Sequence, residues 1–160
     1  MATIDNQIDM SDAEDFKLPS DGVHAGFFQR AEFGLNKAGT REQFTVFMVL
    51  GPDDPDAPNL PVRSYLGWPT DDDKSIMWGS RTAYGAMITA IKELSIALGG
   101  QESGATNPEK LMAFFSKKEG AKIKIRMKIQ KRQTKSEATG KYEDIEPVEY
   151  QSNVTGILPG

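Results

Sequence analysis

Four cationic side chains alternate with apolar ones between residues 122 and 129 of this 160-residue chain. The cations are Lys122, Lys124, Arg126 and Lys128, and the apolar residues are Ile123, Ile125, Met127 and Ile129. Side chains alternate across a β-strand, so this pattern predicts a strand with a buried apolar face and an exposed cationic face. Such a cationic face could neutralise a series of phosphates, or it could protect a sheet edge from unwanted pairing. Lys131 and Arg132 continue the positive charge beyond the strand, which favours phosphate binding because edge protection does not require so long a track.

Aromatic residues close to arginines form a second candidate group. Phe28 and Arg30 are two residues apart, so they are expected on the same face of the first strand. Phe47 is expected on the face of the second strand that is opposite to its core residues. Exposed rings beside cations are what the stacking of nucleic-acid bases requires. The alternative is that helices cover this face and that both rings belong to the core. The pattern alone favours neither interpretation for these two rings.

Tyr65 and Trp68 are stronger candidates for a surface role. Tyr65 shares a parity with Arg63, and Gly67 between Tyr65 and Trp68 leaves room for a close backbone approach. Trp78 falls within the expected first turns of a helix, where it is predicted to pack.

Charge is segregated along the chain, although the formal net charge is -4. The average alone argues against a nucleic-acid partner. However, residues 1–15 contain five acidic residues and no Lys or Arg, whereas residues 110–141 contain eleven Lys or Arg against two acidic residues. The positive charge is therefore concentrated where the alternating strand is predicted.

Several classes of site are disfavoured by composition. The chain has no Cys, and its one histidine, His24, has no second His or Cys to complete a common zinc set, so His24 is interpreted as a surface strand residue. No cofactor is expected. No apolar run approaches a membrane span, and residues 1–16 lack the basic and apolar regions of a signal peptide. These features predict a single cytoplasmic domain with no membrane contact.

One short match suggests an enzyme. Pro55-Asp56 followed by Asp72-Asp73-Lys74 fits the pattern of metal-dependent nucleases, in which two carboxylates hold Mg²⁺ and a lysine orients water. The first half lies in a proline-rich loop, and the second half has the ordinary explanation of capping a helix. We therefore expect a non-catalytic protein and keep the nuclease as an alternative.

The order of predicted elements is three strands, a helical insertion and two strands. Strands are expected at 22–35, 41–51 and 62–68, with Val23, Ala25, Phe27, Ala31 and Phe33 facing the core in the first. A helix is expected from Thr70 to the glycines at 99–100, and a short one after Asn107-Pro108. The alternating strand follows, then a weaker edge strand over 142–151 containing Pro147. This order is that of the OB-fold, a five-stranded Greek-key barrel.

The chain resembles the bacteriophage single-stranded-DNA-binding proteins of the OB-fold type over residues 18–150. The resemblance rests on the opening "LPSDGVHAGFFQRAEFGLNKAGTREQFTVFMVL" and on the later hairpin "IKIRMKIQKRQTKSEATGKYEDI". It implies binding of single-stranded DNA with little sequence preference, in phage replication or recombination, with replication or recombination proteins as further partners. The alternative is a phage assembly protein that uses the barrel for protein contacts.

The predicted organisation is a mobile acidic arm at 1–18, an OB-fold domain at 19–152 and a C-terminal tail at 153–160. The predicted nucleic-acid-binding residues are Phe28, Arg30, Phe47, Arg63, Tyr65, Trp68, Lys122, Lys124, Arg126, Lys128, Lys131 and Arg132.

Overall fold

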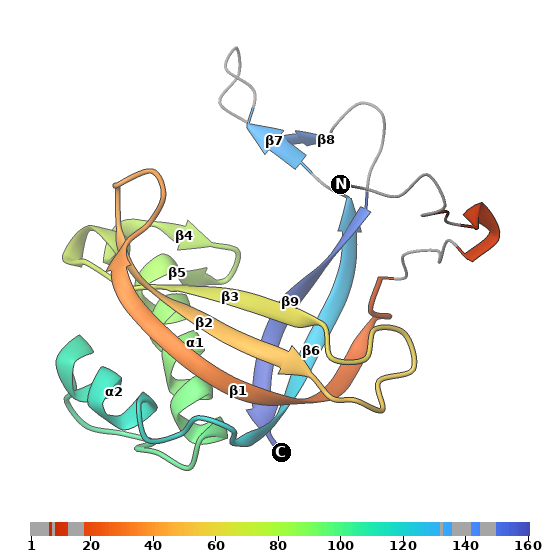
Figure 1. Ribbon diagram of the computed structural model, residues 1–160. Helices are drawn as coiled ribbons and strands as arrows, with labels where there is room; N and C mark the ends of the chain where they lie inside the picture. The colour runs from red at the N-terminus through yellow and green to blue at the C-terminus, as the bar shows by residue number, and fades with distance from the viewer. Residues whose placement is uncertain (1–6, 8, 13–17, 132, 136–141, 145–149) are drawn as a thin grey trace, which may run out of the picture.

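A five-stranded antiparallel sheet organises the computed structural model, which describes residues 7, 9–12, 18–131, 133–135, 142–144 and 150–160. The strand order is β3-β2-β1-β6-β9, as Figure 1 shows. The strands are β1 (Gly22–Leu35), β2 (Glu42–Leu50), β3 (Pro61–Gly67), β6 (Lys122–Lys131) and β9 (Tyr150–Pro159). The prediction of a mainly β fold with a helical insertion between the third and fourth long strands is confirmed.

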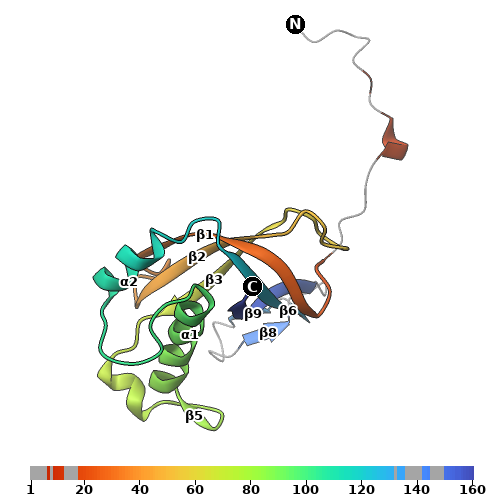
Figure 2. The same cartoon turned by 90° about the horizontal axis from the view of Figure 1, so that it is seen from below.

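The helical insertion lies on one side of the sheet. It contains the 3-10 helix η2 (Asp71–Ser75), the short strands β4 (Met77–Trp78) and β5 (Arg81–Thr82), and the helices α1 (Ala83–Ala97) and α2 (Pro108–Phe115). In Figure 2 both helices lie against the concave inner face of the sheet. Small elements outside the sheet are η1 (Met10–Asp12), β7 (Gln133–Lys135) and β8 (Tyr142–Asp144). No helix among the described residues is long and apolar enough to cross a membrane.

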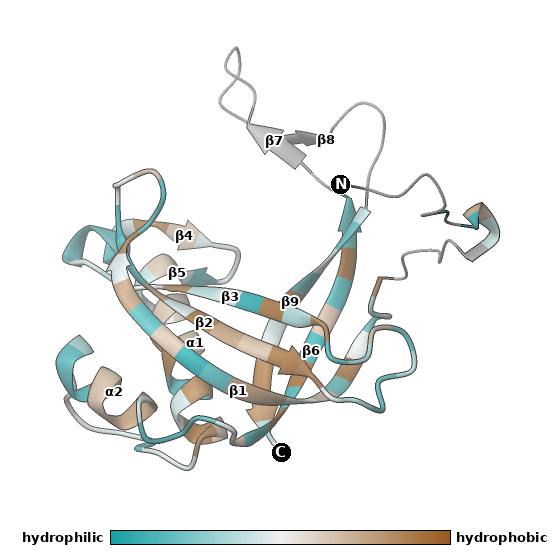
Figure 3. Ribbon diagram, viewed as in Figure 1, coloured by the Kyte–Doolittle hydropathy of each residue, from teal (hydrophilic) through white to brown (hydrophobic). Residues whose placement is uncertain are grey.

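The core lies between this inner face and the helices. Its largest fully buried side chains include Phe28, Phe44, Met48, Leu94, Phe115 and Ile125. The alternation predicted for β6 is confirmed, because Ile123, Ile125 and Met127 are buried and the intervening cations are exposed. Figure 3 shows the same alternation as hydrophilic and hydrophobic bands along β6. The opposite, outer face of the sheet is left for solvent.

The sheet curls but is not closed by hydrogen bonds between its edge strands, β3 and β9, in the part of the chain that the structure describes. The two edges approach each other, and a hollow of about 380 Å³ lies between them. Leu18 and Pro19 line this hollow, and Ser152 Oγ donates a hydrogen bond to the carbonyl of Pro19 at 3.1 Å. The segment before β1 therefore covers the opening, and the closed five-stranded barrel expected from the sequence is not seen.

A β-bulge in β1 reverses the predicted inward-facing parity. The register with β2 shifts between Phe28 and Arg30, so that Gln29 has no single partner. After the bulge Ala31 and Phe33 face inward as predicted. Before it the inward residues are His24, Gly26 and Phe28, whereas Val23 is 52% exposed. The prediction for Val23, Ala25 and Phe27 was wrong because one extra residue exchanges the two faces of a strand.

The helix expected from Thr70 begins thirteen residues later, at Ala83. Thr70 and Asp73 do form a cap, in which the Thr70 N–H donates to Asp73 Oδ2 at 2.8 Å, but it opens only η2. The N-cap of α1 is Thr82, whose Oγ1 accepts from the Gly85 N–H at 3.0 Å. The helix predicted after Asn107 is confirmed, because the Asn107 side chain caps α2 and accepts from Lys110 N–H.

The last strand lies further along the chain than predicted. Strand β9 runs to Pro159 and pairs with β6, so residues 153–160 are not a tail. The β-branched residues Val154, Thr155 and Ile157 favour this extended segment. Of the strand predicted at 142–151, residues 142–144 form β8, residues 150–151 begin β9, and 145–149 lie outside the described residues. Most of the predicted arm at 1–18 also lies outside them.

Candidate nucleic-acid interface

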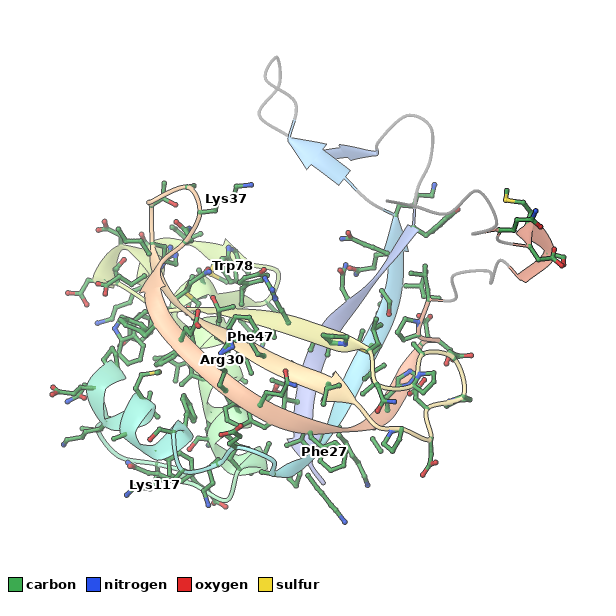
Figure 4. All side chains as sticks on the ribbon, viewed as in Figure 1. Phe27, Arg30, Lys37, Phe47, Trp78 and Lys117 are labelled. Atoms are coloured by element: carbon green, nitrogen blue, oxygen red, sulfur yellow. The ribbon has the colours of Figure 1, made fainter. Side chains whose placement is uncertain are left out.

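One aromatic ring and two arginines form a row across three neighbouring strands on the outer face. Phe47 of β2 is in register with Arg30 of β1 on one side and with Arg63 of β3 on the other. The Arg30 Cζ atom lies 3.8 Å from the centroid of the Phe47 ring, and the Arg63 Cζ atom lies 4.9 Å from it. Figure 4 shows Arg30 and Phe47 side by side on the outward side of β1 and β2. Adjacent strands lie about 4.8 Å apart, so the row spans about 10 Å.

Tyr65 extends this row along β3. It lies two residues after Arg63, so both side chains leave the same face, and it is 60% exposed. We call Arg30, Phe47, Arg63 and Tyr65 the stacking row. A planar guanidinium over an aromatic ring is a favourable cation–π arrangement, and its outer surface is itself a platform on which a base can stack. The Arg30–Phe47–Arg63 part of the stacking row is therefore assembled by its own contacts before any ligand binds.

A carboxylate lies within reach of the stacking row. Glu32 follows Arg30 by two residues on β1, and its Oε1 lies 3.3 Å from Arg30 Nη2. Both side chains are more than half exposed, so the ion pair is screened by water. Glu32 would compete with a phosphate for the same guanidinium.

The four cations of β6 form a second row on the outer face. We call Lys122, Lys124, Arg126 and Lys128 the cationic row, and all four are exposed. Lys122, Lys124 and Arg126 are in register with Phe27, Ala25 and Val23 of β1. An added Cβ at Gly156 of β9 would lie 2.9 Å from Arg126 Nη1, so this glycine makes room for the Arg126 side chain.

The two rows meet at Phe27. This ring is in register with Lys122 of β6 and with Val49 of β2, and Val49 lies two residues after Phe47 on the same face. Phe27 is half-buried and is absent from the core. Sequence reasoning assigned it to the core because the bulge after Phe28 was not foreseen. The one local signal for the outward position of Phe27 is that the apolar residues of β1 change from one face of the strand to the other within its length.

Two aromatic residues predicted to stack on bases do not lie on this face. Phe28 is fully buried and packs against Phe115 with ring centroids 6.2 Å apart. Trp68 is half-buried, and its ring meets the edges of Phe33 and Phe44 at 6.1 and 6.0 Å. Both predictions are corrected, since the inner face and not the outer one receives these rings. Lys131 is exposed at the end of β6, and Arg132 lies outside the described residues.

A buried ion pair holds the end of the sheet near Tyr65. Arg41 Nη1 and Nη2 donate to Asp73 Oδ2 and Oδ1 at 2.6 and 2.8 Å, and Arg41 also donates to the Trp68 carbonyl. Hydrogen bonds from Arg41 and from the Thr70 N–H outweigh burial and lower the pKa of Asp73 to about 2. The Thr70-x-x-Asp73 spacing indicated a cap, but nothing local pointed to Arg41.

This ion pair also bears on the nuclease-like motif. Both carboxylate oxygens of Asp73 accept hydrogen bonds, from Arg41 and from the Thr70 N–H. Asp56 accepts a hydrogen bond from the Ser20 N–H. Asp56 precedes the seven-residue strand β3, whereas Asp73 follows it and pairs with Arg41 at the other end of that strand. The structure does not bring them together. Among the residues that it describes, no group of three or more His, Cys, Asp or Glu is placed to hold a metal ion.

A second buried pair lies under the cationic row. His24 is 6% exposed, its Nδ1 lies 2.5 Å from Asp54 Oδ2, and its Nε2 lies 2.7 Å from the Ser20 carbonyl. The prediction of a surface histidine was wrong, because the bulge turns His24 inward. Burial opposes protonation, but the Ser20 carbonyl and the Asp54 carboxylate outweigh it and raise the pKa of His24. His24 thus ties the loop after β2 and the segment before β1 to the sheet.

The fold and the site together define a mainly β protein, with helices on the inner face of one antiparallel sheet and two cation-bearing rows on its outer face. A scan against protein-family models and a search of curated proteins each gave no match to this chain.

Proposed function

We propose that this protein binds single-stranded DNA with little sequence preference and without catalysis, and that it protects or organises the strand during phage replication or recombination. The observation that carries the proposal is the stacking row, in which two arginines flank one ring on an exposed sheet face. Single-strand binders combine aromatic platforms with a positively charged track, and every base has a π-face to stack. Both components lie on the same face here.

The proposed binding mode assigns different work to the two rows. Bases would stack on Tyr65 and on the guanidinium planes that cover Phe47, while Arg30 and Arg63 also face phosphates. The cationic row would neutralise phosphates further along the strand and release counterions. Phe27, at the junction, would contact the intervening nucleotide.

We also propose that the sheet is an OB-fold in an open form. The order β3-β2-β1-β6-β9 has the neighbours that an OB-fold barrel has, apart from the pairing between its third and fifth strands. OB-folds bind oligonucleotides on the face of their second and third strands, which here are β2 and β3. That face carries Phe47, Arg63 and Tyr65.

The test is a titration by fluorescence anisotropy with a labelled oligo-dT strand, an oligo-dA strand and a matched duplex, each at low and high salt. We expect both single strands to bind alike, the duplex to bind weakly, and affinity to fall as salt rises. A mobility-shift assay with excess Mg²⁺ runs in parallel and shows whether the protein shifts the strand or degrades it.

Charge-matched variants separate a specific face from general attraction. Lys124→Ala with Lys128→Ala removes two cations from the cationic row, and Lys110→Ala with Lys117→Ala removes two from α2 and the segment after it. We expect only the first pair to weaken binding. No binding of any nucleic acid would overturn the proposal in favour of an assembly protein, and Mg²⁺-dependent strand loss would overturn its non-catalytic part.

A further inference from the structure

The β4–β5 hairpin exposes three consecutive apolar side chains. Ile76, Met77 and Trp78 are 45%, 59% and 53% exposed. The hairpin is held by backbone contacts such as the hydrogen bond from Ala83 N–H to the Ile76 carbonyl at 2.7 Å, so these side chains are not needed to close it. Single exposed apolar residues are ordinary, but a contiguous run marks an interaction site. Figure 2 shows the hairpin projecting beyond the N-terminal end of α1, away from the sheet.

The same chain also has a hollow with a mainly apolar lining, which could receive the apolar side chains of the hairpin. It has a volume of about 510 Å³ and lies between α1, the loop at 101–106 and α2. Its apolar lining comes from Trp68, Tyr84, Ile88, Ile91 and Leu111, and Ile88 is 41% exposed. The volume lies within the range of sites that enclose a bulky group such as an indole.

The charged residues around the hairpin are complementary to those around the hollow. Arg81 is in register with Trp78 on the hairpin, and Asp72 lies just before it. Glu102 and Lys92 line the hollow. Arg81 can therefore pair with Glu102, and Asp72 with Lys92. The acids Asp71 and Asp72 offset the cations Lys74 and Arg81, and Asp71 is paired with Lys74 at 3.1 Å, so the hairpin presents no excess of positive charge to a nucleic acid.

We infer that the hairpin of one copy docks, through Trp78, in the apolar hollow of a second copy. The inferred contact is heterologous, so that each copy retains one free hairpin and one free hollow, rather than a reciprocal two-fold contact in which both hairpins and both hollows are filled. Copies then add head to tail. The inference does not depend on nucleic-acid binding, and it is tested without DNA.

The experiment is sedimentation equilibrium of the full chain over concentrations up to about 0.5 mM, where an interface with a Kd near 0.1 mM is mostly assembled. We expect the wild-type mass to rise past that of a dimer. Trp78→Ser, which removes the central anchor, should weaken association about 30-fold. Ile88→Glu should act similarly at the hollow, and a glutamate there lies four residues before Lys92, a spacing that supports the helix.

Mixing the two variants decides the geometry. Each should be monomeric alone, whereas an equimolar mixture should form a dimer and stop, because only one intact hairpin and one intact hollow remain. The mixture also shows that both variants are folded. Leu35→Ser, at an apolar site at the end of β1 that is more exposed than Trp78 or Ile88, should associate as wild type does.

Three results would overturn the inference. They are a wild-type chain that stays monomeric up to the highest concentration, variants that associate as wild type does, and a mixture that stays monomeric. The last result would show a contact between two like surfaces.

Discussion

The stacking row and the cationic row occupy the same face of one sheet but are built differently. In the stacking row three of the four side chains contact one another, since Phe47 lies between Arg30 and Arg63, and Arg30 also pairs with the neighbouring Glu32. The cationic row consists of four like charges spaced two residues apart on β6. The first row has a fixed shape, whereas the second supplies charge along a line. Shape suits stacking, which salt affects little, and charge suits counterion release, which salt affects strongly.

The ion pairs that lie near the two rows differ as well. Arg41–Asp73 lies at the end of β3, and the pKa of Asp73 is far below the physiological range. His24–Asp54 lies under the cationic row, where His24 is in register with Ile125 of β6, and histidine titrates near neutral pH. The Arg41–Asp73 pair near the stacking row should therefore be insensitive to pH around neutrality. The His24–Asp54 pair under the cationic row should be sensitive to pH in that range.

The largest expected effect comes from breaking the ion pair at the stacking end. Asp73→Asn removes a carboxylate that is almost fully buried and leaves Arg41 without its counter-charge, so the free energy of unfolding should fall by about 3 kcal/mol. Asp73 has a lowered pKa in the folded state, so its contribution is present above the unfolded value of 3.8 and is lost as pH falls toward 2. Urea unfolding at pH 7 and at pH 3 measures both.

Asp72→Asn is the control, because Asp72 is the exposed neighbour of Asp73. It should leave stability unchanged at both pH values. Equal destabilisation by both variants would show that η2, rather than the Arg41–Asp73 pair, carries the effect.

Neutralising the cationic row should produce the next largest effect. Replacing Lys124, Arg126 and Lys128 together by alanine should lower the affinity for oligo-dT about 30-fold at low salt, through the loss of three phosphate contacts. The slope of log K against log salt should fall by about 2, because each phosphate contact on a single strand contributes about 0.7. An unchanged slope would show that the strand does not reach β6.

Phe47→Ala tests the other row by the same titration. It should lower affinity about tenfold, because Arg30 and Arg63 lose the ring that holds their guanidinium planes in place for stacking, and it should leave the salt slope as it is, because no charge is removed. Thr45→Ala, two residues earlier on the same face of β2, is the matched control and should bind as wild type does. A steep change in slope for Phe47→Ala would remove the distinction between the two rows.

Sequence patterns predicted the cationic row more fully than the stacking row, for a physical reason. Strict alternation from Lys122 to Lys128 determines which side chains face out, and a regular strand preserves it. In β1 the bulge at Gln29 exchanges the faces, so Phe28, His24 and Phe27 were each placed on the wrong side. A bulge depends on pairing with β2, which is a nonlocal contact that a local pattern does not contain.

The helical insertion and the last strand show the same limit. The capping signals at Thr70 and Asn107 both mark real caps, but the residues after Thr70 form only η2 before a hairpin intervenes. The Arg41–Asp73 pair, 32 residues apart in sequence, explains why Asp73 is buried there. Strand β9 extends over residues that look like a tail, because its partner β6 supplies the pairing.

A smaller effect should follow pH near neutrality. His24 has a raised pKa in the folded state, so its stabilising contribution is complete below the unfolded value of 6.5 and is lost as pH rises through the folded value. Thermal unfolding should show wild-type stability falling over this interval. His24→Gln should show a flat profile there, and a profile that still falls would assign the dependence to another group.

The smallest expected effect tests whether the contacts of Arg30 within the stacking row determine its affinity for the strand. Glu32 holds Arg30 through an exposed ion pair at 3.3 Å, and a phosphate must compete with it. Glu32→Gln should therefore tighten oligo-dT binding by up to about threefold, since exposed ion pairs contribute little. Glu42→Gln, an exposed acid at the start of β2, controls for the change in net charge and should tighten binding less. Equal tightening by both would mean that Arg30 responds only to the overall field, in which case the contacts within the stacking row do not set its affinity for the strand.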